Sequence, residues 1–309
     1  MLIFEINEEN NKYYNIKEIL KSYYNMSDKL IAKLKRYKRI YKNDIPAYVT
    51  EKITTHDIIK IDLDFDEESD NIIATPFELN IIYEDEYMII INKEAGYPIH
   101  PSNLHYTDTI SNFIKHHFEK NNIKRKIRPV NRLDKDTSGI TIFAKSDYIQ
   151  DILIKQMSNN ILKKEYLAIT EGIPNESNGK ISAPIARKYG SIIEREINFT
   201  EDSSLGIDYK PYPAETLYNV ISSNAENNLS LISFTLLTGK THQIRLHSRY
   251  IGCPLLGDSL YNKESNLISR QALHSYRISF IHPITKEELE FTATLPSDME
   301  TIINNFNLK

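Results

Sequence analysis

Apolar residues near the start of the chain recur three or four positions apart, which is the spacing of one helix face. The first run is Ile16, Ile19, Leu20 and Tyr23, and the second is Leu30, Ile31 and Leu34. Ser27 stands before the second run, in the place of an N-cap. The pattern predicts two short helices, followed by strand-like segments within residues 40–52 and 57–65.

An acidic segment, DLDFDEESDN, follows at residues 62–71. It has no apolar periodicity, and a run of acids without periodicity is typical of a solvated linker. We therefore expect a domain boundary within residues 66–76. This divides the chain into a small α+β domain, residues 1–70, and a large domain, residues 71–309.

Strand patterns outnumber helix patterns in the large domain. Residues 81–96 predict two strands around an acidic turn, while residues 140–146 and 231–238 alternate like strands. Helices are expected at three places: 107–122 with Thr107 or Asp108 at its start, 147–159, and 241–252 with Thr241 as N-cap and Gly252 as C-terminal stop. Because no repeat appears, we expect a mixed, mostly antiparallel α+β fold.

Composition narrows the classes of protein that remain. Hydrophobic residues make up 40% of the chain and charged residues 26%, as in globular proteins. The longest apolar runs fall far short of the roughly 18 residues that a bilayer span needs, and the N-terminus lacks a basic signal region. These features predict a cytoplasmic protein without membrane contact. The single cysteine, Cys253, excludes internal disulfides and cysteine-based zinc sites.

The net charge of −4 hides two basic stretches that contain no acid. The first comprises Lys29, Lys33, Lys35, Arg36, Lys38, Arg39 and Lys42, and the second comprises Lys124, Arg125, Lys126, Arg128 and Arg132. Local clusters of this kind can bind phosphate groups. Taken alone, a charge run is more typical of a solvated helix face.

The stretch RLDKDTSG, residues 132–139, admits two kinds of chemistry. Asp134, Asp136 and Ser138 alternate as at the start of a calcium loop, but such a loop needs a glutamate at its twelfth position, which here is Lys145. The alternative is a catalytic carboxylate at Asp134. A partly buried carboxylate stays ionised only beside a cation, so we expect an arginine from elsewhere in the chain.

The best candidate for this cation is Arg245 in TGKTHQIRLH, where His242, Arg245 and Arg249 share one helix face. By spacing alone, a basic face that merely solvates the helix is the favoured interpretation. His242 and His247 lie about 140° apart around a helix, which makes them poor joint metal ligands. No Gly-rich phosphate loop is present, so neither a metal nor a nucleotide cofactor is expected.

These motifs together resemble the RluA-type family of RNA pseudouridine synthases. The resemblance rests on RPVNRLDKDTSGITIFAKS and TGKTHQIRLHSRYIGCPLLGDSLYN, with shorter matches in YEDEYMIIINKEAGYPIHPS, KKEYLAI and LHSYRISFIHP, and spans roughly residues 80–297. Residues 1–70 are similar, less distinctly, to the alpha-L RNA-binding module, although IYKNDIPAY replaces its usual turn. A helical cap without an RNA role is the alternative for this part.

The resemblance implies a pseudouridine synthase fold and an isomerisation of uridine in RNA without a cofactor. It assigns Asp134 as the catalytic aspartate, Arg245 as its partner, Tyr166 as the residue that stacks on uracil, and Arg132 as the base-flipping arginine. It also places Lys164, Lys240 and His242 in substrate binding. In the small domain it implies an RNA-binding patch of Lys33, Lys35, Arg36, Lys38 and Arg39.

Four positions depart from the family pattern: Glu94, Asn131, Lys240 and Cys253 stand where Pro, His, Arg and His are usual. Lys240 gives up the bidentate phosphate recognition of arginine. The expected substrate is large-subunit ribosomal RNA, bound by a monomer, with transfer RNA as the second choice. A catalytically idle RNA-binding or ribosome-assembly factor is the alternative from another class. A hydrolytic glycosidase would need Asp136 as a second carboxylate.

Overall fold

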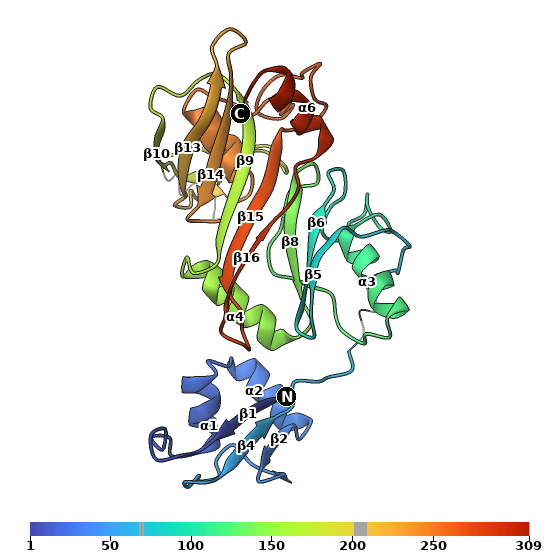
Figure 1. Ribbon diagram of the computed structural model, residues 1–309, viewed down its shortest axis with the longest axis vertical. Helices are drawn as coiled ribbons and strands as arrows, with labels where there is room; N and C mark the ends of the chain where they lie inside the picture. The colour runs from blue at the N-terminus through green and yellow to red at the C-terminus, as the bar shows by residue number, and fades with distance from the viewer. Residues whose placement is uncertain (68, 70, 201–208, 309) are drawn as a thin grey trace.

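The computed structural model describes residues 1–67, 69, 71–200 and 209–308. Its N-terminal part is a small unit with a four-stranded sheet in the order β1-β4-β2-β3 (Figure 1). The elements are β1 (Leu2–Glu5), α1 (Ile16–Glu18), the π-helical η1 (Ile19–Tyr23), α2 (Asp28–Arg36), β2 (Ile40–Lys42), β3 (Ile45–Pro46) and β4 (Ile58–Ile61).

The predicted start of α2 is confirmed. The Ser27 hydroxyl accepts a hydrogen bond from the backbone N–H of Leu30, which satisfies one of the free donors of the first helical turn. Leu30, Ile31 and Leu34 are buried against the small sheet, as their spacing predicted.

The remainder of the chain builds around one large sheet, whose core order is β10-β13-β14-β9-β15-β8-β6-β5, with β16 added to β15 and β7 to β8. The strands are β5 (Ile81–Glu84), β6 (Met88–Lys93), β7 (Arg128–Pro129), β8 (Ser138–Ala144), β9 (Lys163–Glu171), β10 (Asn178–Ser182), β13 (Glu215–Asn224), β14 (Leu229–Leu236), β15 (Leu273–Ile281) and β16 (Glu288–Thr292). Among the described strands only β15 and β8 pair in parallel. The predicted mixed, mostly antiparallel α+β fold is confirmed.

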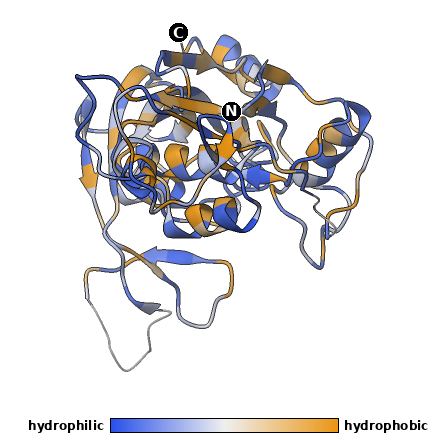
Figure 2. Cartoon of the chain, turned by 90° about the horizontal axis from the view of Figure 1, so that it is seen from below, coloured by the Kyte–Doolittle hydropathy of each residue, from blue (hydrophilic) through white to orange (hydrophobic). Residues whose placement is uncertain are grey.

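Four helices lie around this sheet: α3 (Ile110–Lys120), α4 (Asp147–Ser158), α5 (Gln243–Tyr250) and α6 (Ser297–Asn305). Alternate residues of β6 face opposite sides, so Ile89 and Ile91 pack with α3 while Met88 and Ile90 join the core on the side of α4. Hydrophobic and hydrophilic residues both occur along the helices in Figure 2, as expected of helices that cover a sheet with one side. A separate ribbon pairs β11 (Ile185–Arg187) with β12 (Arg195–Ile197).

Two predicted helix starts were wrong. Helix α3 begins after Thr109 rather than Thr107 or Asp108, because Thr109 and Asn112 cap each other reciprocally. Helix α5 begins after His242, whose φ of 58° is left-handed, rather than after Thr241. The Gln243 side chain accepts hydrogen bonds from the Lys240 N–H and the Thr238 hydroxyl, which closes the preceding turn. Gly252, with φ of 79°, ends the helix as predicted.

The acidic segment is not the solvated linker that its composition predicted. Phe65 is only 7% exposed, and Glu67 accepts hydrogen bonds from Lys33 of α2 and Arg128 of β7. Arg125 pairs with Asp64, and Arg39 pairs with Asp62. The acids therefore neutralise basic residues of the same chain: Lys33 and Arg39 of the first basic stretch, and Arg125 and Arg128 of the second.

No helix in the described ranges combines the length and apolar character needed to cross a membrane.

Candidate active site

The loop that carries Asp134 joins β7 to β8, and its backbone is held from several sides. The Thr137 N–H donates to the Asp134 carbonyl (3.1 Å), which closes a turn. Lys93 at the end of β6 donates to the Lys135 carbonyl at 2.8 Å, and Arg270 donates to the Asp136 carbonyl at 3.1 Å. The loop is thus fixed through its carbonyl groups, which leaves the Asp134 side chain free to face the pocket.

Gly139 and Asn131 fix the loop to the sheet. A Cβ atom at Gly139, where φ is 110°, would lie 2.3 Å from the carbonyl oxygen of Ser275, so β8 and β15 can meet only at a glycine. The Asn131 side chain donates to the Ile140 carbonyl and accepts from the Ile142 N–H. Two side-chain hydrogen bonds of Asn131 therefore hold the start of the loop against β8.

Asp134 and Arg245 meet as expected from the sequence. Arg245 Nη1 lies 3.2 Å from Asp134 Oδ2, across a separation of 111 residues. The same guanidinium makes two 2.7 Å hydrogen bonds to Asp258, which is 1% exposed. Asp258 fixes the arginine in place, and the remaining N–H groups reach the carboxylate of the loop.

Burial and neighbouring charges shift the pKa values of Arg245 and His242. Burial alone would lower the pKa of Arg245, but the hydrogen bonds and negative charges of Asp258 and Asp134 raise it. Burial lowers the pKa of His242, and the Arg245 charge lowers it further against the opposing effect of Asp134. His242 is therefore neutral at pH 7. Its Nδ1 lies 2.8 Å from the hydroxyl of Tyr261, and its Nε2 lies 3.8 Å from Asp134.

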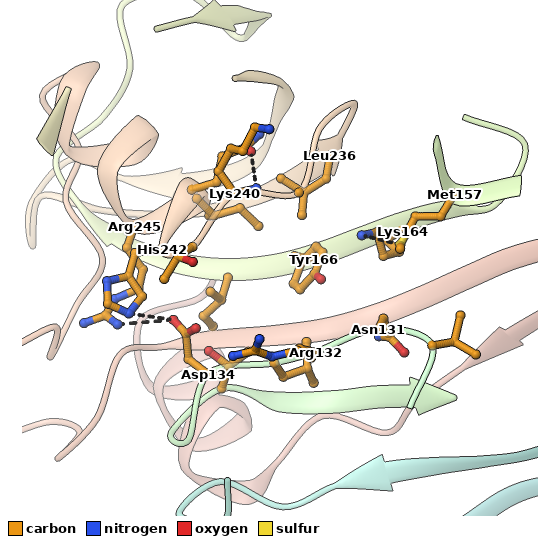
Figure 3. A pocket seen from close by; sticks show the side chains of 18 residues that line it. Asn131, Arg132, Asp134, Met157, Lys164, Tyr166, Leu236, Lys240, His242 and Arg245 are labelled. Carbon is orange, nitrogen blue, oxygen red and sulfur yellow. Dashed lines mark hydrogen bonds and ion pairs between the residues drawn. The ribbon is translucent and has the colours of Figure 1, made fainter. Parts of the chain in front are cut away.

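Asp134, His242 and Arg245 line a pocket of about 310 Å³, which is also lined by Tyr166 and Lys164 of β9. In Figure 3, Tyr166 lies between Asp134 and Arg245 on one side and Lys164 on the other. Burial raises the pKa of the Tyr166 hydroxyl, so the hydroxyl keeps its proton and the side chain is neutral at pH 7. The volume falls within the range of roughly 300–1,000 Å³ that is usual for small-molecule sites.

Arg132 and Lys240 are exposed residues at the same pocket. Within the part of the chain that the structure describes, Arg132 makes no ion pair. Arg249 is exposed and does not line the pocket, so the predicted shared face with Arg245 was wrong for this residue: Arg245 points inward to Asp258.

The five residues of the predicted RNA-binding patch divide into two groups. Lys33 is paired with Glu67 and Asp147, and Arg39 is paired with Asp62. Lys35, Arg36 and Lys38 are exposed, and none of them makes an ion pair within the described ranges.

Sequence reasoning missed Asp258, Tyr261, Lys93 and Arg270. A signal for Asp258 was present, because a buried arginine beside a single carboxylate calls for a second acid, and Asp258 follows α5 in LLGDSLY. The contacts by which Lys93 and Arg270 hold the Asp134 loop run to backbone carbonyls, which no residue pattern reveals. The described residues contain no group of three or more His, Cys, Asp or Glu side chains arranged to hold a metal ion.

Comparison with known proteins gives one consistent family. Residues 87–250 match the family described as RNA pseudouridylate synthase. The chain is 38% identical over 250 residues to the uncharacterized RNA pseudouridine synthase YhcT of Bacillus subtilis, with 81% of this chain and 79% of that protein covered. It is 35% identical to ribosomal large subunit pseudouridine synthase D of Zymomonas mobilis, with 72% and 71% covered.

Two solved structures share the fold. Human RNA pseudouridylate synthase domain containing 4 gives a TM-score of 0.58 at 24% identity and covers 74% of this chain and 94% of that one. Human RNA pseudouridylate synthase domain containing 1 gives 0.56 at 22% identity, with 75% and 96% covered.

Proposed function

Because this chain belongs to the RNA pseudouridylate synthase family and is an RNA pseudouridine synthase, we propose that Asp134 is the carboxylate that acts on the ribose of the target uridine. The observation that carries this assignment is the contact of Asp134 with Arg245 at a pocket wide enough for a nucleoside. The buried guanidinium holds the carboxylate in a fixed orientation at the pocket.

The reaction breaks the bond between N1 of uracil and C1′ of ribose and forms a bond between C5 and C1′. The proton on C5 is lost and N1 gains one, so no oxidant or second substrate is required. Asp134 acts at the sugar, either by adding to C1′ or by removing the proton on C2′. Arg245 is its positioning partner, and His242 lines the same side of the pocket as a neutral group.

The uridine has to leave its stack to reach Asp134, at a cost of a few kcal/mol. We assign this step to Arg132, because it is exposed at the pocket beside Asp134 and has no acidic partner among the described residues. Tyr166 offers a flat, neutral ring on which uracil stacks. Lys240 supplies positive charge at the opening of the pocket, and Lys164 lines the interior of the pocket.

Large-subunit ribosomal RNA is the proposed substrate, in the cytoplasm, because relatives that share about a third of the sequence are named for that activity. The small N-terminal unit contributes the exposed Lys35, Arg36 and Lys38 to binding of the RNA backbone. Contacts of this kind weaken as salt rises.

Release of tritium from C5 of uracil tests both the reaction and the aspartate. Wild-type protein is incubated with ribosomal RNA transcribed with tritium at this carbon, beside Asp134→Asn and Asp136→Asn. We expect wild type and Asp136→Asn to release tritium at comparable rates, and Asp134→Asn to bind RNA but lose at least about a thousandfold in rate. Undiminished release by Asp134→Asn would refute the assignment.

A further inference from the structure

Lys164 is a buried cation without an acidic partner. It is 7% exposed, and no carboxylate of the described residues pairs with it. The hydrogen-bond contact of its Nζ is the sulfur of Met157 at 3.3 Å. A thioether is a weak acceptor, whereas an ammonium group carries three donor hydrogens.

Lys93 shows how the same chain satisfies a buried lysine that has a structural task. Its Nζ donates to the carbonyls of Glu94, Tyr97 and Lys135 at 2.8–2.9 Å, so its three donors have strong acceptors. Lys164 has no comparable set. Burial lowers the pKa of Lys164 to about 8, which means that the folded protein destabilises its charge without compensating for it. Such an arrangement is expected where a ligand supplies the missing acceptor.

The position of Lys164 indicates which ligand this is. Lys164 and Tyr166 lie two residues apart on β9, so their side chains leave the same face of the sheet, and both line the pocket. Figure 3 shows Lys164 on the side of Tyr166 that is away from Asp134 and Arg245. A ribose held at Asp134 therefore directs the far edge of a base stacked on Tyr166 towards Lys164.

Building on the function proposed above, we propose that Lys164 donates a hydrogen bond to a ring carbonyl of the extracted uracil and makes the pocket selective for uracil over cytosine. A protonated lysine can only donate. Uracil has carbonyl oxygens at C2 and C4, whereas cytosine has an amino group at C4. The amino group and the ammonium group are both donors, so they cannot form a hydrogen bond with each other.

The same donor fits the substrate before and after the isomerisation. Exchange of N1 and C5 turns the ring about the axis through N3 and C6, and this turn also exchanges O2 with O4. Each orientation therefore presents a carbonyl oxygen to Lys164. A cytosine ring would place its amino group there in one of the two orientations.

A phosphate group is the competing ligand for a lysine. The apolar side chains of Val130, Met157 and Leu236 line the pocket along with Lys164. A phosphodiester remains tied to the strand outside, and its charge is hydrated more strongly than a base carbonyl, so a buried site with apolar neighbours favours the base. Lys240, which is exposed at the pocket, is better suited to the phosphate.

The test compares binding of short oligouridylate and oligocytidylate strands by fluorescence anisotropy, for wild type, Lys164→Met and Lys163→Met. Lys163 precedes Lys164 on β9 but is exposed, so it controls for loss of one charge. We expect wild type and Lys163→Met to prefer oligouridylate by about tenfold or more. Lys164→Met should lose this preference, with weaker binding of oligouridylate and unchanged binding of oligocytidylate.

Two results would overturn the proposal. One is an unchanged preference in Lys164→Met. The other is equal weakening for both strands with a drop of about one in the slope of log affinity against log salt, which marks a lost phosphate contact. Should Lys164→Met fail to fold, Lys164→Gln serves instead, because a rotated amide can pair with either base and should also abolish the preference.

The homopolymers make the result independent of the ribosomal target. If ribosomal RNA releases no tritium but the preference for uridine depends on Lys164, the proposed target is wrong and the role of Lys164 stands. If tritium is released and the preference does not depend on Lys164, the role of Lys164 is wrong and the catalytic function stands.

Discussion

Arg245 illustrates how single residues acquire a role that their position in the sequence does not reveal. Spacing alone favoured a solvated helix face for this residue. In the structure its guanidinium is buried between two carboxylates, and Asp258 takes the stronger, bidentate share of its hydrogen bonds. Removing Arg245 would leave Asp258, which is 1% exposed, as an uncompensated buried charge, and this is the most costly kind of change in the cluster.

Asp258→Asn should lower kcat by about 10–100-fold while the affinity for RNA changes little. Asp258 does not line the pocket, but without its charge Arg245 shifts towards Asp134 and misplaces the carboxylate. Steady-state tritium release and RNA binding measure the two effects. Glu165→Gln is the control, because it also takes an acidic partner away from an arginine, here Arg277. Glu165 directly precedes Tyr166 on β9, so its side chain lies on the face of the strand opposite to the pocket. Equal kcat losses in both variants would contradict the positioning role.

His274 predicts a pH dependence of stability. It is fully buried on β15 beside Ser138, and burial lowers its pKa to about 4 from the usual 6.5. Between these values the unfolded chain binds a proton that the native protein does not, so stability falls as pH falls from about 6.5 to about 4.

The loss attributable to His274 should approach about 3 kcal/mol at the acid end of this window. Urea unfolding of wild type and His274→Asn across the window measures it. Wild type should lose more stability than the variant, and parallel curves for the two proteins would exclude His274 as the cause.

At the scale of elements, apolar patterning predicted β6, β8 and α4, and the structure buries both faces of β6 and β8. The patterning failed at the starts of α3 and α5, where capping by Asn112 and a left-handed His242 decide the first residue. It also gave no sign that β8 would lie parallel to β15, since that pairing joins strands more than a hundred residues apart. Gly139 makes this pairing possible.

Gly139→Ala should destabilise the protein by at least about 3 kcal/mol. The new Cβ would face both an unfavourable φ and the Ser275 backbone at 2.3 Å. Gly96→Ala is matched to it, because φ is also positive there but nothing lies within 4 Å of the new Cβ. The control should cost about 1 kcal/mol. Similar free energies of unfolding for both variants would show that backbone conformation alone requires a glycine at 139.

At the scale of the whole molecule, the N-terminal unit is docked on the rest of the chain rather than tethered to it. Helix α4 lies between this unit and the large sheet (Figure 1). Lys33 of α2 and Arg128 of β7 share two acids, Glu67 and Asp147. Burial raises the pKa of Asp147, but Lys33 and Arg128 together lower it below its usual value, so Asp147 is ionised at neutral pH.

Arg128→Ala should lower the free energy of unfolding by about 3 kcal/mol, because it leaves two partly buried carboxylates with only Lys33 as partner. Lys126→Ala is the control: it removes an exposed lysine two residues away and should change stability by less than about 0.5 kcal/mol. Urea unfolding gives both values. Equal stability of the two variants would show that the network does not hold the units together.

The sequence by itself indicated part of the secondary structure, namely α2 to α5 and the strands β5, β6, β8 and β14, together with the α+β class and the family, because apolar spacing and motif order are local properties of the chain. It also identified Asp134 and the need for a distant arginine. Only the tertiary structure decided which basic residues remain free for RNA, since Lys33, Arg39, Arg125 and Arg128 are neutralised by acids of the same chain. The tertiary structure also left Lys164 buried with no acidic partner among the described residues, because burial and pairing depend on residues far apart in sequence.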